Sequence, residues 1–347
     1  MSRRNMMLRG FVTLGAIALL LMPAAAQVPT DPEKLLADRF GFTAAEITQA
    51  RGGKAVAKLL TSQDSSDIGV LGVVRIDGTP ARLSGWLRDV ANFRKAAELG
   101  LARQIGTPPK IGDFADLALD SDELAALRDC APGNCDLRLG DAAIKQFQAI
   151  DWKAADAGRR ANLIARQLLL GHADAYLKGG DAALGAYHNE SQPRAAADEF
   201  RLVLAQATTL KQLAAPLTSY LTGFPAVALP QSESLLYWAK GGAGPDAAIS
   251  IHQLVTWRAP GGEIIVVDKL LFSSRYIEAG LTVISMAPTV DGKGFYVLAG
   301  VRARSSQLSG LGARMLRGRV EKVARDTASM YLNWIRSSLS SAADGIW

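Results

Sequence analysis

The sequence predicts an α+β fold in which an antiparallel sheet packs against a long C-terminal helix, with a helical region inserted before most of the strands. Three observations predict it. Apolar residues alternate with a period of two in successive segments from about residue 233 to 305. An amphipathic pattern with helical period runs from about 308 to 339. Residues 152–224 have helical spacing throughout.

The chain begins with the pattern of a secretory signal. Three arginines precede an apolar run of 12 residues, Phe11–Met22, and a small-residue site follows at Ala24–Ala26. A bilayer span needs about 20 apolar residues, so the run is too short for an anchor. We therefore expect residues 1–26 to be cleaved as a signal peptide and the mature protein to be periplasmic or secreted. The stretch SRRNMML leaves twin-arginine export open beside the general route.

Composition and charge describe an ordinary globular protein. Hydrophobic residues make up 49% of the chain and charged residues 21%. Without residues 1–26, 36 basic residues stand against 33 acidic ones, and the two signs are interspersed. This balance argues against nucleic acid as a partner. No later stretch is apolar enough to predict a transmembrane span.

Residues 27–53 are expected to form a leader and a short helix. Thr43 and Glu46 have the spacing of a capping box, and two glycines end the helix. Strands are predicted at 54–60 and 67–77, joined by the polar segment TSQDSS.

A helix is predicted to start at Thr79, with Pro80 at its first position, and to continue to residue 96. Its expected apolar stripe is Leu83, Trp86, Leu87, Val90 and Phe93.

The two cysteines lie close together in RDCAPGNCDL. Outside the cytoplasm an even pair of thiols usually oxidises, and the turn of Pro132, Gly133 and Asn134 folds the chain back. We therefore expect a structural disulfide between Cys130 and Cys135. A redox or metal site is the alternative, but four residues separate the cysteines and no histidine is near them in sequence.

The second half of the chain alternates between turns and strands. APGG and TVDGKG supply hairpin turns, so neighbouring strands must be antiparallel. The last helix is expected to bury one stripe, consisting of Leu311, Met315, Val320, Val323, Met330, Trp334 and Ile335. The expected strands are ESLLYWAK, AAISIHQLVTWRA, EIIVVDKLLFSS, AGLTVISMAP and GFYVLAGVRARSS.

This order of elements resembles the START-like, or helix-grip, SRPBCC-type superfamily. The segment GGKAVAKLL, followed by IGVLGVVRIDGTPARLSGWLRDVANF, and the pair GFYVLAGVRARSS and LSGLGARMLRGRV carry the resemblance. It implies one domain formed by 54–150 and 233–340, with a helical insertion at 151–232. It also implies a curved sheet that grips the last helix, a lipid or other apolar ligand between them, and no cofactor.

Physical reasoning supports such a cavity in part. A curved sheet cannot bring all its inner side chains into contact with one helix, so the gap collapses, fills with side chains or holds a ligand. Gly310, Gly312 and Gly318 reduce bulk at the start of the last helix. They either leave room for a ligand or allow close packing of helix on sheet.

Arg302 is the residue most expected to bind a ligand carboxylate or phosphate, because a buried arginine needs an anionic partner. The candidate ligand-binding residues are Arg302, Arg275, Trp238, Trp257, Tyr276 and Met315. The tryptophans and the tyrosine are equally consistent with ordinary core positions.

No catalytic or metal-binding motif is present. The mature chain has three histidines, His172, His188 and His252, without metal-type spacing, and no G-x-S-x-G occurs. The sequence therefore favours an exported binding protein for a lipid or other apolar ligand over an enzyme. Two alternatives remain open. One is an envelope protein that presents its helical region to a protein partner, and the other is a hydrolase with a dispersed site.

Overall fold

The computed structural model describes residues 31–341, apart from 208–209, 211–213, 243–246 and 310–312. The predicted signal at 1–26 lies outside the described residues, as do Gly310, Leu311 and Gly312 of the last helix.

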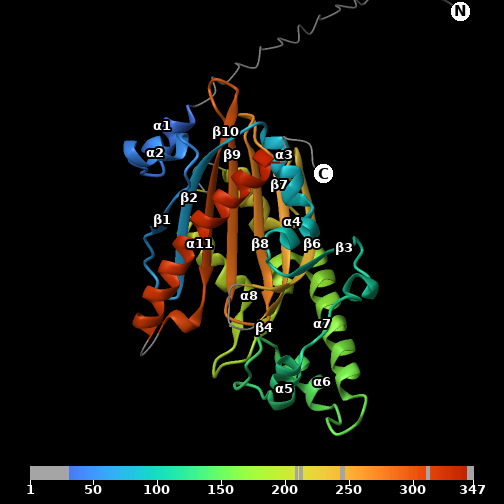
Figure 1. Cartoon of the computed structure of the whole chain (residues 1–347). Coiled ribbons are helices and arrows are strands. Elements are labelled where there is room, and N and C mark those ends of the chain that lie inside the picture. Colours follow the sequence, from blue (N-terminus) through green and yellow to red (C-terminus); the bar gives the residue numbers. More distant parts are fainter. Residues whose placement is uncertain (1–30, 208–209, 211–213, 243–246, 310–312, 342–347) are drawn as a thin grey trace, which may run out of the picture.

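The centre of the molecule is an antiparallel sheet of eight strands in the order β1-β2-β10-β9-β8-β7-β6-β3 (Figure 1). β10 joins the C-terminal meander to the N-terminal hairpin by pairing with β2. The α+β prediction is confirmed. The strands are β1 (Val56–Leu60), β2 (Asp67–Asp77), β3 (Leu101–Ile105), β6 (Ser232–Gly241), β7 (Ala248–Arg258), β8 (Ile264–Ser273), β9 (Ala279–Pro288) and β10 (Gly294–Arg304).

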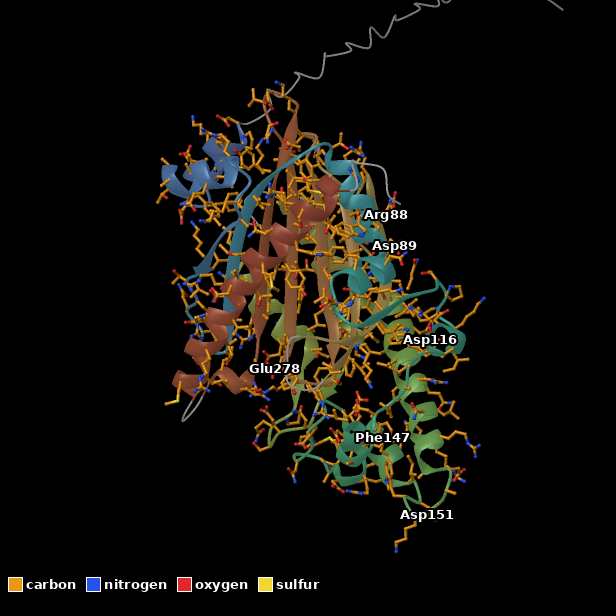
Figure 2. All side chains as sticks on the ribbon, viewed as in Figure 1. Arg88, Asp89, Asp116, Phe147, Asp151 and Glu278 are labelled. Carbon is orange, nitrogen blue, oxygen red and sulfur yellow. A yellow bond between two sulfur atoms is a disulfide. The ribbon has the colours of Figure 1, made fainter. Side chains whose placement is uncertain are left out.

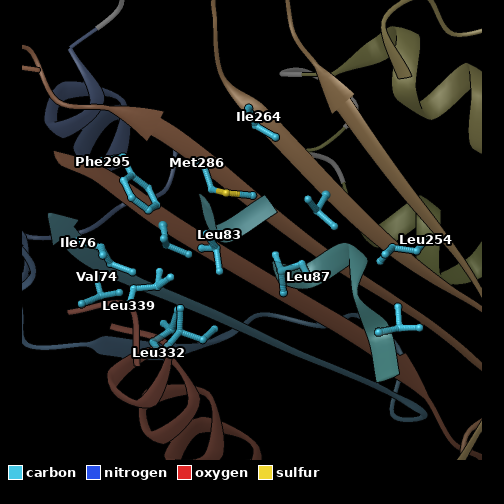
Figure 3. Close-up of a cluster of buried hydrophobic side chains, with 14 of the residues drawn as sticks. Val74, Ile76, Leu83, Leu87, Leu254, Ile264, Met286, Phe295, Leu332 and Leu339 are labelled. Carbon is cyan, nitrogen blue, oxygen red and sulfur yellow. The ribbon is translucent and has the colours of Figure 1, made fainter. Parts of the chain in front are cut away.

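One face of the sheet, which we call the α11 face, packs against α3 (Pro80–Arg88), α4 (Val90–Ala96) and the long helix α11 (Ala313–Ser341). In Figure 1, α11 crosses β1 and β2 diagonally. Figure 3 shows how Leu83 and Leu87 of α3 and Leu332 and Leu339 of α11 meet side chains of the strands. Burial of these apolar side chains is the main force that holds the helices on the sheet.

The opposite face is also covered, because alternate residues of each strand point to opposite sides. One group of helices buries Leu71 and Val73 of β2, and the other buries Trp238, Trp257 and their neighbours. The first group is α1 (Pro32–Asp38) and α2 (Ala44–Arg51), and the second is α7 (Ala157–Gly179), η2 (Gly180–Ala183), α8 (Ala196–Gln206) and α10 (Ala215–Gly223).

A smaller apolar cluster around Phe147 extends beyond the sheet, below it in Figure 2. The expected disulfide, Cys130–Cys135, is present at its edge. Arg138 ties this region to the sheet through a buried ion pair with Glu278. The remaining elements are η1 (Ile111–Phe114), α5 (Ser121–Asp129), α6 (Asp141–Gln148), the hairpin β4 (Ala186–Tyr187) and β5 (Arg194–Ala195), and η3 (Ser306–Leu308).

Two details of the predicted helices were wrong. The helix expected at 80–96 breaks at Asp89, whose side chain instead accepts a hydrogen bond from the Asn92 N–H and caps α4. The stripe predicted for the last helix is right at Trp334 and Ile335, which pack against the sheet, but wrong at Met315, Val323 and Met330, which are exposed. Among the described residues of α11, Leu332, Trp334, Ile335 and Leu339 belong to the apolar cluster on the α11 face.

Candidate functional site

A cavity of about 420 Å³ lies on the α11 face, between the sheet and the helices that cover it. Phe93 of α4 borders one side, and Tyr331 and Leu332 of α11 border the other. Strands β6 to β10 form the floor. This volume falls within the range of about 300–1,000 Å³ that is usual for small-molecule sites. A gap between the sheet and the last helix is therefore present, and side chains do not fill it.

Three aromatic side chains join the two helical borders of this cavity. The Trp86 ring of α3 lies 5.2 Å from Phe93 of α4 and 5.0 Å from Trp334 of α11, between ring centroids. Phe93 and Trp334 are 5.7 Å apart in an edge-on arrangement. Moving α11 away from α3 and α4 would break the two contacts of Trp334.

A polar cluster interrupts the otherwise mainly apolar floor. His252 Nδ1 lies 2.7 Å from Asp268 Oδ1, and His252 Nε2 lies 2.8 Å from Ser250 Oγ. The Tyr237 hydroxyl donates a hydrogen bond to the other carboxylate oxygen of Asp268. The Tyr237 ring stacks on the imidazole of His252, with centroids 4.6 Å apart and planes within 7°. All four residues line the cavity.

Strand geometry explains why these residues meet. Ser250 and His252 are two apart on β7 and so point to the same face. Asp268 comes from β8 and Tyr237 from β6, the two neighbours of β7, and Tyr237 is directly opposite His252. The register between β7 and β8 shifts at Ile251/His252, a local irregularity of the kind that re-aims side chains.

Electrostatics set the protonation states of Asp268 and Tyr237. Burial raises the pKa of Asp268, but the charge and hydrogen bond of His252 and the bond from Tyr237 outweigh it and lower that pKa below 3.8. Asp268 is therefore ionised near neutral pH and only accepts hydrogen bonds. The proton of a neutral His252 must then be on Nδ1, which leaves Nε2 as an acceptor for the Ser250 hydroxyl. Burial and the charge of Asp268 raise the pKa of Tyr237 well above 10, which keeps its hydroxyl a donor.

Arg94 of α4 places a positive charge on the cavity wall. Its Nη2 donates to the Leu99 carbonyl over 2.7 Å, while its buried Nε–H has no hydrogen-bond partner among the described residues. This Nε–H has almost no surface open to the cavity, so what Arg94 offers a bound molecule is its positive charge.

The structure places the predicted ligand-binding residues mostly elsewhere. Trp238 and Trp257 are buried on the face opposite α11, where their indole N–H groups donate to the carbonyls of Asp113 and Pro230. Met315 is 75% exposed. None of these three side chains lines the cavity.

Arg302 is a lining residue of the cavity, but its guanidinium is paired with a carboxylate. Its Nη1 is 2.6 Å from Asp67, a fully buried carboxylate. The sequence predicted that a buried Arg302 needs an anionic partner, and Asp67 of the same chain is that partner. Arg275 and Tyr276 lie in the turn between β8 and β9, and each has a partner of its own. Gly318 has open space around it, so it does not mediate close helix packing.

Sequence analysis missed Ser250, His252, Asp268, Tyr237 and Arg94 as a group. They come from four separate elements, and the Ser-x-His spacing on β7 has no recognised motif. The sequence offered one signal. Ser250, His252 and Asp268 are polar or charged residues on otherwise apolar faces of strands that the sequence predicts. Assigning those faces required the register between strands.

The other two histidines have structural partners. His172 of α7 packs against Phe272, and its Nε2 lies 3.3 Å from the Leu271 carbonyl oxygen. His188 pairs with Asp141 at 2.7 Å. Among the described residues, no group of three His, Cys, Asp or Glu side chains is arranged to hold a metal ion.

A second cavity, of about 410 Å³, lies on the opposite face between α1 and α8. Leu35, Phe40, Val283 and Leu298 are among its mainly apolar lining residues. It contains no polar cluster comparable to that around His252 in the described part of the chain.

Lys269 is the most deeply buried cation of that opposite face. Its Nζ lies 2.5 Å from Asp181 and 2.9 Å from the Leu221 carbonyl, and 4.0 Å from the centre of the Phe200 ring. Burial lowers its pKa, against the opposing charge of Asp181. These contacts satisfy the ammonium group and join β8 to the helices above it.

None of the described helices has the length and apolar character needed to cross a membrane.

Comparison with known proteins does not assign the chain to a family. No protein-family model matches the chain, and no curated protein matches it. One solved structure with similarity is the crystal structure of the di-domain ARO/CYC StfQ from the steffimycin biosynthetic pathway. It is 13% identical, with 90% of this chain and 97% of that chain covered, and the TM-score is 0.22. At that score the similarity supports no argument, so the candidate site rests on its own geometry.

Proposed function

We propose that the protein binds an amphipathic small molecule, such as a lipid, in the cavity between the sheet and α11. The observation that carries the proposal is a mainly apolar cavity of about 420 Å³ whose lining includes the cation Arg94. Apolar pockets with a few placed polar groups are typical of ligand sites. An acyl chain would lie against the apolar floor, with each buried CH₂ contributing about 0.8 kcal/mol, and an acceptor such as a carboxylate would face Arg94.

The test compares a charged and an uncharged ligand of equal chain length. Fluorescence titration would measure the affinity of a fatty acid and of the matching fatty alcohol for wild type and Arg94→Met. We expect the variant to bind the acid at least about tenfold more weakly, since hydrogen bonds to charged groups contribute about 1.5–3 kcal/mol. The alcohol should lose much less affinity. Arg88→Met is the matched control, because Arg88 pairs with Glu233 on the surface.

Mass spectrometry of organic extracts of the purified protein would show any co-purifying lipid. Absence of a bound lipid together with no binding of either titrated ligand would exclude this function. Equal weakening of both ligands in Arg94→Met would exclude the assigned role of Arg94.

We also propose that the protein acts outside the cytoplasm. The basic, apolar and small-residue pattern of 1–26 supports this, and so does a disulfide between the two cysteines of the chain. Cell fractionation with mass spectrometry of the mature N-terminus is the test. We expect a periplasmic or secreted chain that begins at Gln27, and a cytoplasmic chain that retains Met1 would exclude it.

A further inference from the structure

The cluster on the cavity floor has the connectivity of a nucleophile, a base and an orienting carboxylate. The chain of contacts runs from Ser250 Oγ to His252 Nε2 at 2.8 Å, and from His252 Nδ1 to Asp268 Oδ1 at 2.7 Å. Both distances are those of well-formed hydrogen bonds. The only other contact of the Ser250 hydroxyl among the described residues is with the Ala239 carbonyl at 3.5 Å, too long to compete.

The imidazole is held in place from several sides. Tyr237 stacks on its face and also donates to Asp268, so both oxygens of the carboxylate are occupied. The side chain of His252 is 16% exposed and that of Asp268 26%, and both line the cavity. A base that is oriented on one side and open to a cavity on the other can serve a substrate there.

We propose that Ser250, His252 and Asp268 form a hydrolytic triad that cleaves esters whose acyl chain occupies the cavity. Ser250 is the nucleophile and His252 the general base, while Asp268 is a positioning residue that acts through His252. The inference rests on the proposed function, because it assumes that the apolar chain binds on the α11 face. It adds a reaction to that binding.

The reaction balances with water as the only co-reactant. Ser250 Oγ bonds to the ester carbonyl carbon while its proton moves to His252 Nε2. The bond from that carbon to the alkoxy oxygen then breaks, and the alcohol leaves with the proton from His252. Water attacks the acyl-serine with His252 again as base, which releases the carboxylic acid and restores the Ser250 hydroxyl. The acid product carries the carboxylate that Arg94 is suited to bind.

The test begins with covalent labelling of the full chain. An alkyl fluorophosphonate should add once to wild type with loss of fluoride, and peptide mapping should place the phosphonate on Ser250. Ser250→Ala should abolish labelling and lower kcat/KM for p-nitrophenyl butyrate and octanoate by at least about 100-fold. Ser340→Ala should keep both, because Ser340 is an exposed residue of α11 that bonds only the Arg336 carbonyl.

Asp268→Asn tests the positioning role. An amide at this position favours the wrong tautomer of His252, so kcat should fall while the affinity for a fatty acid stays within about threefold. Thermal unfolding of each variant shows whether it is folded. A purely structural cluster would change stability without any labelling at Ser250.

The outcomes separate the two proposals. Wild type that binds the fatty acid but neither labels at Ser250 nor hydrolyses either ester overturns the triad and leaves the binding function standing. Labelling at Ser250 without fatty-acid affinity overturns the binding function instead. Ester hydrolysis that survives in Ser250→Ala at the wild-type rate also overturns the triad.

Discussion

A carboxylate in a mostly apolar sheet is stable only where its oxygens are paired, and Asp268 meets that condition with two partners from neighbouring strands. Burial opposes its ionisation, yet the bonds from His252 and Tyr237 hold it ionised. Arg94 adds a cation to the same wall. The polar residues of the α11 face thus stabilise one another, and we assign the positive charge of Arg94 to a ligand.

His172 predicts how stability depends on pH. Burial lowers its pKa from 6.5 to about 4, against the hydrogen bond to the Leu271 carbonyl. As pH falls from about 6.5 towards 4, the unfolded chain takes up the proton before the folded chain does, so the free energy of unfolding decreases in that window. We expect a contribution of about 2 kcal/mol, less than the full shift because the ring is only partly buried.

The measurement is urea unfolding of wild type and His172→Phe at pH 7 and pH 4.5. The stability lost between the two pH values should be smaller in the variant by about 2 kcal/mol. Identical pH dependence of the two proteins would show that His172 does not titrate in this way.

The buried ion pair between Arg138 and Glu278 predicts a large effect of a single substitution. Their side chains are 5% and 3% exposed, and Glu278 also accepts two bonds from Ser306. Figure 2 labels Glu278 at the end of the sheet nearest the disulfide region. Glu278→Ala leaves the Arg138 charge buried without its partner and should lower the free energy of unfolding by about 3–5 kcal/mol.

The matched control removes both charges. Arg138→Met combined with Glu278→Leu should recover most of that loss, because two apolar side chains need no partner. Urea unfolding measures all three proteins. A double variant as unstable as Glu278→Ala would mean that packing, and not the unpaired charge, explains the loss.

At the scale of elements, the local patterns predicted which segments form helices and strands better than they predicted what each element faces. The capping box of Thr43 and Glu46, the hairpin of β1 and β2 and the C-terminal meander all form as expected. The stripe predicted for α11 is correct at Trp334 and Ile335 but includes Met315 and Met330, which are apolar yet exposed. Apolar residues on both sides of a helix leave its buried side undetermined until the sheet beneath is placed.

The candidate site could not be predicted for a related reason. Ser250 and His252 are visible as a pair on one strand, but Asp268 joins them only through the pairing register of β7 with β8, which places it diagonally from His252. A shift of one residue would turn Asp268 to the other face. Sequence reasoning instead favoured Trp238 and Trp257, whose size predicted burial correctly but not which face of the sheet they lie on.

The observed phase of α11 is testable with one pair of substitutions. Leu332 is 2% exposed and lies so close to β2 that a Cβ on Gly72 would be 2.6 Å from its Cδ1. Leu332→Ala should cost about 2–5 kcal/mol, as truncation of a buried leucine does. Met330→Ala, at a position 59% exposed, should change stability by less than about 0.5 kcal/mol. Urea unfolding measures both variants, and a larger loss for Met330→Ala than for Leu332→Ala would support the burial of Met330 that the sequence predicted.

For the molecule as a whole, the sheet is buried on both faces. The helical region at 151–232 therefore has a structural role, because it covers one of those faces. The resemblance implied an insertion at 151–232, and one hypothesis gave that region a surface for a protein partner. In the structure its helices bury the strand residues opposite the α11 face, among them Trp238, Val255 and Trp257. The domain bounds stay a prediction, but these helices form part of the core that supports the cavity floor.

Deletion of residues 151–224 should therefore prevent the rest of the chain from folding, and not merely remove a surface that binds a protein partner. The shortened chain would expose the apolar side chains that α7, α8 and α10 cover, and Lys269 would lose Asp181 and the Leu221 carbonyl. Large exposed apolar patches lead to aggregation. We expect the shortened chain to be insoluble under conditions in which the full chain is soluble, as shown by centrifugation and size-exclusion chromatography. A soluble, monomeric deletion variant with cooperative urea unfolding would instead mean that the sheet and α11 form a complete domain, with the helices as a separable unit.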